Sequence, residues 1–260
     1  SKKNFNLAEP LPQLLKKVAE LGSTNTQEVI NQIELINREY PDDAEAWHQT
    51  GLLCLNINQT EKAIQKLSQA ALKNPKNALY QSNLGELYRR QGMLDHSIRI
   101  NKNAVKLKPD MVNANYNLAI AYYDNGDYNR AIKFYKKTVQ LNPAHGMAWN
   151  NMGTCYEKKL DFDEAHLMYE RAVKINSDHL EALNNLATTH NHKGNTDEAI
   201  KIFNQAIDLK PDFFEAHFNL SGLKTYTEDD PHLQTLKQFT KSNKRFMQDA
   251  TIRLHFAYAK

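Results

Sequence analysis

A side-chain amide recurs every 34 residues along most of this 260-residue chain. An amide donates and accepts hydrogen bonds at once, so a row of amides can pair with the peptide units of another chain whatever its side chains are. The chemistry that we expect from this row is recognition of an extended peptide, not catalysis. The six residues of this amide column are Gln49, Asn83, Asn117, Asn151, Asn185 and Asn219.

Further polar and aromatic residues flank the amide column at helical spacing, and we predict that they line the same groove. Neighbouring helix pairs stack about 10 Å apart, and an extended chain advances about 3.3 Å per residue. One amide would therefore meet about every third residue of a bound peptide. The flanking candidates are Tyr116, Tyr123, Asn150, Asn184, Thr154 and Thr188.

The amides must be positioned by a repeated element, and three further columns share the 34-residue period. One column holds small residues, a second holds alanine or serine from Ala63 to Ala199, and a third holds mostly proline from Pro75 to Pro211. Apolar residues at helical spacing predict two helices in each period, broken by a turn and ended by the proline. The small residues, where two backbones must approach closely, are Gly51, Gly85, Ala119, Gly153, Ala187 and Ser221.

The turn within each period is predicted from residues that tolerate a left-handed backbone. Glycine occupies the same turn column at Gly92, Gly126 and Gly194, and asparagine can replace it at Asn58. Leu160 occupies this column in the fourth period. Because leucine disfavours positive φ, we predict a differently shaped turn there.

These columns resemble the tetratricopeptide repeat (TPR) pattern. The resemblance implies an all-α fold, a right-handed α-α superhelix of antiparallel helix pairs that binds proteins. Its five repeats would span 44–77, 78–111, 112–145, 146–179 and 180–213. The asparagines are also similar to those of the O-GlcNAc transferase repeats, which hold substrate main chain. Asparagine is common in this column across the family, so ancestry and local helix chemistry stay open as an alternative explanation. The fullest match is formed by Trp149, Met152, Gly153, Tyr156, Ala165, Tyr169 and Ala172.

Both ends of the chain are predicted to be divergent repeats. Residues 1–43 form a degenerate N-terminal cap, with Asn25 capping its second helix and Glu28 as its partner. Residues 214–260 start a sixth repeat, whose second helix should run from Asp230-Pro231 to about Ser242. Residues 252–259, including Ile252, Phe256, Ala257 and Ala259, would begin a further helix without a partner, and end-to-end self-association through it is one expectation. Residues 222–260 resemble the junction in bacterial proteins whose repeats precede a sulfotransferase domain.

Composition excludes several classes of protein. The chain carries 33 basic and 30 acidic residues and a net charge of +3, so it offers no strong attraction to nucleic acid. It has no run long enough to span a membrane, and we predict a cytoplasmic protein, although the missing initiator methionine leaves room for a removed leader. Cys54 and Cys155 are expected to be free, and Trp47 and Trp149 to pack in the core.

No catalytic motif stands out, so we predict a non-enzymatic scaffold without cofactor or metal that binds a protein or peptide partner. His190 and His192 are unsuited to one metal ion because they face different sides of a helix. The alternative function is a substrate-recruiting arm of a larger sulfotransferase or glycosyltransferase, whose catalytic domain would lie beyond Lys260.

Overall fold

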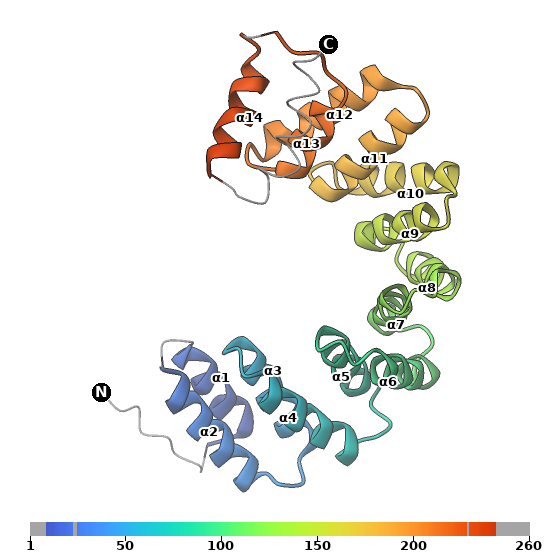
Figure 1. Ribbon diagram of the computed structural model, residues 1–260. Helices are drawn as coiled ribbons and strands as arrows, with labels where there is room; N and C mark the ends of the chain where they lie inside the picture. Colours follow the sequence, from blue (N-terminus) through green and yellow to red (C-terminus); the bar gives the residue numbers. More distant parts are fainter. Residues whose placement is uncertain (1–8, 23–24, 228, 243–260) are drawn as a thin grey trace. The chain divides into compact units, whose positions relative to one another are not determined.

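The computed structural model describes residues 9–22, 25–227 and 229–242, which form fourteen α-helices and no strand. The chain divides into two compact units, residues 1–141 and residues 142–260. No described helix is both long enough and apolar enough to cross a membrane. The helices of unit 1 are α1 (Leu11–Leu21), α2 (Thr26–Glu39), α3 (Ala44–Asn56), α4 (Thr60–Lys73), α5 (Ala78–Arg90), α6 (Leu94–Leu107), α7 (Val112–Asp124) and α8 (Tyr128–Leu141) (Figure 1). The helices of unit 2 are α9 (Gly146–Lys158), α10 (Phe162–Ile175), α11 (Leu180–His192), α12 (Thr196–Leu209), α13 (Phe214–Ser221) and α14 (Pro231–Ser242).

Within each unit the helices pack in consecutive pairs. In unit 1, α3 packs on α4, α5 on α6 and α7 on α8; in unit 2, α9 packs on α10 and α11 on α12. Within a unit, the second helix of a pair also contacts the first helix of the next pair: α4 contacts α5 and α6 contacts α7 in unit 1, and α10 contacts α11 in unit 2. The predicted all-α helical repeat solenoid is confirmed.

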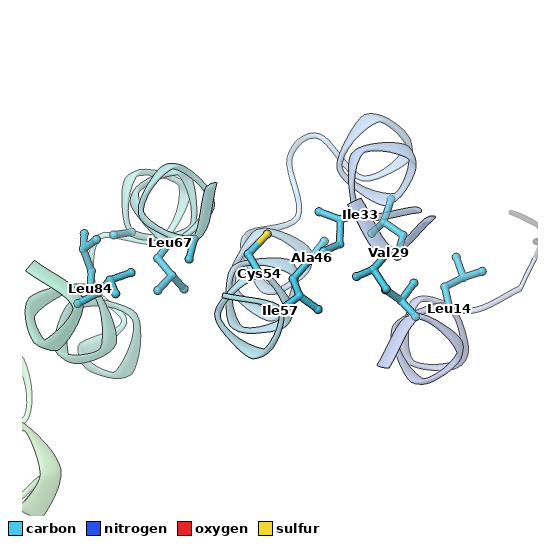
Figure 2. Close-up of a cluster of buried hydrophobic side chains, with 13 residues drawn as sticks. Leu14, Val29, Ile33, Ala46, Cys54, Ile57, Leu67 and Leu84 are labelled. Atoms are coloured by element: carbon cyan, nitrogen blue, oxygen red, sulfur yellow. The ribbon is translucent and has the colours of Figure 1, made fainter. Parts of the chain in front are cut away.

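The core of unit 1 begins with the N-terminal helices. Leu14 of α1 and Ile33 of α2 are fully buried and join a cluster that reaches Leu67 of α4 and Leu84 of α5 (Figure 2). Asn25 caps α2 as predicted, since its Oδ1 accepts the backbone N–H of Glu28 at 3.4 Å.

Glycines of the small-residue column lie in tight contact with the second helix of their pair. A Cβ added to Gly51 would lie 2.8 Å from the side chain of Leu67, and one added to Gly153 would lie 2.7 Å from the ring of Tyr169. The first helices therefore need a small residue at this position, which accounts for the 34-residue spacing of this column.

The prediction of a differently shaped turn at Leu160 is wrong. Leu160 adopts a φ of +62°, close to the +57° of Asn58 and within the left-handed region that Gly126 occupies at +77°. Its N–H donates to the carbonyl of Glu157 at 2.9 Å, and the N–H of Gly126 donates to Tyr123 at 2.9 Å. We infer that the packing of the helices on either side determines the shape of this turn, and that Leu160 is held in the left-handed conformation in spite of its strain.

The tryptophans also differ from the prediction. Trp47 and Trp149 are partly exposed instead of buried in the core. Each indole N–H donates at 2.9 Å to the carbonyl of the proline six residues earlier, Pro41 or Pro143. These hydrogen bonds therefore stabilise the turns that precede α3 and α9. Asn115 lies at the equivalent position, 34 residues before Trp149, and its Nδ2 donates to the carbonyl of Pro109 at 3.0 Å.

The sixth repeat diverges after its first helix. Helix α13 ends at Ser221 after eight residues, whereas the equivalent helix α11 has thirteen. Helix α14 starts at Pro231 as predicted, and Asp230 caps it by accepting the backbone N–H of His232 at 2.8 Å. Residues 252–259, including Ile252 and Phe256, lie outside the described part of the chain.

Candidate functional site

The amide column lies on the first helix of each pair, with three members in each unit. All six side chains are partly buried, so each has one side on the scaffold and another open to solvent. In unit 1 the members are Gln49 on α3, Asn83 on α5 and Asn117 on α7; in unit 2 they are Asn151 on α9, Asn185 on α11 and Asn219 on α13.

In unit 1 the asparagines are hydrogen-bonded to the preceding first helix. Nδ2 of Asn117 donates to Oγ of Ser82 at 3.0 Å and to the carbonyl of Ser82 at 3.4 Å. Nδ2 of Asn83 donates to Nε2 of His48 at 2.9 Å. Burial lowers the pKa of His48, although Glu45 opposes it, so the neutral imidazole can accept this bond. Each bond joins residues 35 positions apart in the sequence.

Unit 2 repeats the same arrangement with amide partners. Nδ2 of Asn185 donates to Oδ1 of Asn150 at 3.1 Å, and Nδ2 of Asn219 donates to Oδ1 of Asn184 at 2.9 Å. Asn150 in turn donates to Oδ1 of its neighbour Asn151 at 3.3 Å. Asn150 and Asn184 were predicted as groove residues; in the structure each accepts a hydrogen bond from the next repeat, and Asn150 is buried.

The amides are thus partly committed to the scaffold, which sequence analysis did not foresee. One N–H of Asn83, Asn117, Asn185 and Asn219 is used within the chain, while a carboxamide has two N–H groups and an oxygen with two lone pairs. Each partner lies 35 residues before its amide. It is therefore the residue that immediately precedes the amide of the previous repeat. Ser82, which the prediction omitted, is one of these partners.

The two threonines on this surface in unit 2 present acceptors. Oγ1 of Thr188 donates to the carbonyl of Asn184 at 2.8 Å, and Oγ1 of Thr154 donates to that of Asn150 at 3.3 Å. Because each hydroxyl hydrogen points back along its helix, oxygen lone pairs remain for a partner. The Tyr169 hydroxyl lies 3.3 Å from Oγ1 of Thr154 and donates to Glu157 at 2.8 Å.

The two tyrosines predicted for the groove lie on α7 and are partly buried. The ring of Tyr116 lies 5.9 Å from that of Tyr135, and the ring of Tyr123 lies 5.7 Å from that of Tyr128, centroid to centroid. Both rings therefore pack on α8 and leave part of their surface open.

Unit 1 adds charge to this surface, whereas the amide and threonine positions of unit 2 are neutral. Arg89 on α5 donates to Glu86 at 2.8 Å and reaches Asp124 on α7 at 2.7 Å. Burial alone would raise the pKa of Glu86, but hydrogen bonds from Arg89 and Arg90 outweigh it and hold that pKa below its usual range. The two units thus offer different chemistry to a partner.

Other candidate chemistry has a structural role where the chain is described. Among those residues no group of three His, Cys, Asp or Glu side chains could hold a metal ion. Asp161 caps α10 by accepting the N–H of Glu164 at 3.4 Å. Cys54 and Cys155 are free and buried.

Part of the chain matches a known family of repeats. Residues 110–178 and residues 159–222 each match a family model for the tetratricopeptide repeat. Residues 110–222 thus resemble tetratricopeptide repeats, and the stacked helix pairs of the described residues form an all-α repeat fold. No curated protein sequence matches the chain.

Several solved structures share this fold at low sequence identity. The protein YrrB, described as a TPR protein with an unusual peptide-binding site, has a TM-score of 0.57 and 21% identity over 71% of this chain and 95% of its own. The protein pilF from Pseudomonas aeruginosa has a TM-score of 0.65 and 15% identity over 80% of this chain and 97% of its own. A TPR protein from Parabacteroides merdae has a TM-score of 0.62 and 20% identity over 79% of each chain.

Proposed function

We propose that this protein is a non-catalytic interaction module that binds an extended segment of a partner protein along the first helices of its repeats. The observation that carries the proposal is the amide column. Its members recur once per repeat and stay partly open to solvent, and four of the six are held in place by bonds to the preceding repeat. A preordered polar row of this kind loses little side-chain entropy when a peptide docks.

The remaining polar atoms suit a peptide backbone. After one N–H is committed to the scaffold, each of these asparagines still offers an oxygen and a second N–H. The hydroxyls of Thr154 and Thr188 add acceptors in unit 2. The resemblance of these asparagines to those of the O-GlcNAc transferase repeats, and the peptide-binding site described for YrrB, are consistent with this function. Main-chain recognition predicts tolerance of many ligand side chains.

The test begins with a phage-displayed library of random peptides panned against the whole chain. Selected peptides are synthesised and their affinities compared between wild type and an Asn185→Ala/Thr188→Val variant. We expect the variant to bind about tenfold or more weakly, because two hydrogen bonds are lost.

A matched control removes exposed side chains from second helices of the same unit. Arg171→Ala/Lys201→Ala alters α10 and α12 and should leave peptide affinity unchanged. Thermal unfolding of both variants is measured in parallel, since Asn185→Ala also removes the bond to Asn150, at a cost of about 1 kcal/mol. Equal affinities of the groove variant and the control for every selected peptide would refute the proposal.

A further inference from the structure

The exposed faces of α6 and α8, the second helices of two successive pairs in unit 1, are basic. Helix α6 has three basic residues and one acidic residue, and α8 has four basic residues and no acidic one. The small net charge of the whole chain therefore conceals a strong local excess. The basic face consists of Arg99, Lys102, Lys106, Lys133 and Lys136, which are exposed, and Lys137, which is partly buried.

The basic residues of the two helices occupy equivalent positions in their repeats. Lys133 lies 34 residues after Arg99, and Lys136 lies 34 residues after Lys102. Helices α6 and α8 both pack on α7, and each lies to the right of its first helix in Figure 1. Equivalent positions of stacked pairs are about 10 Å apart. Since a helix rises 1.5 Å per residue, Arg99 and Lys106 are also separated by about 10 Å along α6.

Three of these charges have no acidic partner among the described residues. Arg99, Lys102 and Lys106 form no ion pair there, because the acidic residues of unit 1 that form ion pairs do so with other cations. Arg130 on α8 differs, since it pairs with Asp127 at 3.2 Å, and it is left out of the basic face. Like charges three or four positions apart on one helix repel each other. The basic face is thus destabilising unless an anionic partner covers it.

The second helices of unit 2 lack this face. Helices α10 and α12 together carry six acidic and three basic residues. The position of Lys102 and Lys136 is occupied by Glu170 in α10 and by Asn204 in α12. The basic face is therefore a property of two particular repeats and does not follow from the repeat pattern itself.

Carboxylates fit this face better than the bases of a nucleic acid do. Lysine is a flexible point charge that pairs with a carboxylate in many orientations. Bases bind by stacking on aromatic rings, but the rings beside the face pack inward on α7. Tyr128 packs on Tyr123 with ring centroids 5.7 Å apart, and Phe134 packs on Tyr122 at 5.8 Å.

The spacing of the charges also suits a polypeptide. Lysines three or four positions apart on a helix have Cβ atoms about 5–6 Å apart. Glutamates at the same spacing on a helix, or at alternate positions of an extended chain, lie about 5–7 Å apart. Several carboxylates of one short segment can therefore each meet a cation of the basic face.

We propose that the basic face is a second docking surface, which binds an acidic segment of a partner protein. It lies on second helices, whereas the amide column lies on first helices, so the two surfaces do not overlap. The inference does not depend on what the amide column binds. Neighbouring charges of the face lie within about one Debye length of each other, so they attract an acidic segment together, and salt weakens this attraction.

Fluorescence anisotropy of a labelled glutamate peptide tests the proposal on the full chain. A peptide of about twelve residues, half of them glutamate, is long enough to reach both helices. We expect it to bind at about 50 mM salt and at least about tenfold more weakly at about 500 mM. The same peptide with glutamine in place of glutamate should not bind. No binding of the glutamate peptide at low salt, or equal binding of the glutamine peptide, would overturn the proposal.

Charge variants locate the site. Lys102→Glu/Lys133→Glu reverses one charge on each helix and should weaken binding about tenfold or more. Lys102→Gln/Lys133→Gln, which creates no new anion, should give a smaller loss. The matched control Lys174→Glu/Lys201→Glu changes the net charge as much as the first variant does, at exposed positions of α10 and α12, and should lose far less affinity. Equal losses in the control and in the first variant would show that only the total charge matters, which would refute a defined site.

Other anionic partners are compared directly. The probes are vesicles that contain phosphatidylserine and a single-stranded DNA oligonucleotide of mixed sequence. Tighter binding of either than of the glutamate peptide would overturn the assignment to a protein segment. Asn117→Ala, which alters the amide column of the same unit, should leave binding of the glutamate peptide unchanged, so this test is separate from that of the proposed function.

Discussion

The side chain of Asn101 lies against the backbone of Gly85, where a Cβ built on the glycine would lie 2.5 Å from Nδ2. Leu67 fills the equivalent place against Gly51 in the preceding helix pair. Asn101 is fully buried, and although Nδ2 donates to Ser97 at 3.2 Å, Oδ1 has no partner. The pair α5 and α6 therefore has an unsatisfied polar group where its neighbour has apolar packing.

We expect Asn101→Leu to raise the free energy of unfolding by about 1–3 kcal/mol, because it removes a buried polar atom that pays a desolvation cost. Urea unfolding followed by circular dichroism measures the change. The reciprocal Leu67→Asn variant should be destabilised. A less stable Asn101→Leu protein would show that the asparagine is needed at this position.

Leu160→Gly should stabilise unit 2 by about 0.5–1 kcal/mol. A left-handed conformation costs a leucine about 1–2 kcal/mol, and glycine avoids this cost. Glycine also has a larger conformational entropy in the unfolded state, which offsets part of the gain in the free energy of unfolding. The leucine side chain is 75% exposed, so little packing is lost. The reverse change, Gly194→Leu, should lower the midpoint of urea unfolding. A lower midpoint for Leu160→Gly would mean that the strain is absent.

The two glycines of α9 should respond differently to alanine. Gly153→Ala places a methyl group 2.7 Å from the ring of Tyr169, so we expect a loss of about 1–3 kcal/mol in the free energy of unfolding. In Gly146→Ala the nearest atom, in Ile175, lies 3.5 Å away, an ordinary contact. This variant is the control and should be neutral or slightly stabilised. Equal stability of the two variants in thermal unfolding would contradict the close approach.

The two cysteines should report the opening of each unit separately. Burial raises the pKa of Cys54 to about 11 and that of Cys155 to about 12, and both side chains are fully buried. In the native protein at pH 8 we expect labelling by a disulfide reagent to be slower than for a free thiol by orders of magnitude. Cys54→Ala leaves the reporter in unit 2, and Cys155→Ala leaves the one in unit 1. Prompt native labelling would show that a thiol is accessible.

Much of the fold could be predicted because its signals are local. Glycine or asparagine at the turns, a cap such as Asn25 and the Asp230-Pro231 start of α14 each fix a few neighbouring residues. Leu160 misled the prediction because its own preference is weaker than the packing of the helices around it. Trp149 misled the prediction because an indole has both an apolar ring, which can be buried, and an N–H, which can donate a hydrogen bond. Periodicity alone does not tell which of the two determines where the side chain lies.

The sequence period predicts which amides share a helix position but not the hydrogen bonds that they make. The 34-residue period places Asn117 and Asn185 on equivalent faces, whereas their partners Ser82 and Asn150 are offset by one residue. Which atoms meet across two helices depends on how those helices are stacked, and that is a property of the tertiary structure. The hydrogen bond between Nδ1 of His217 on α13 and Nε2 of His232 on α14, at 2.9 Å, was missed for the same reason, since the irregular segment before α14 hides their proximity.

Within a unit, the bonds from Asn117 to Ser82 and from Asn219 to Asn184 each link a helix only to its immediate predecessor. Bonds of this kind do not depend on how many repeats the protein has. A duplication of one whole period inside a unit would bring its own donor and its own acceptor, and every junction would again be complete. Repeats can therefore be gained or lost in evolution without new contacts being needed between neighbouring repeats.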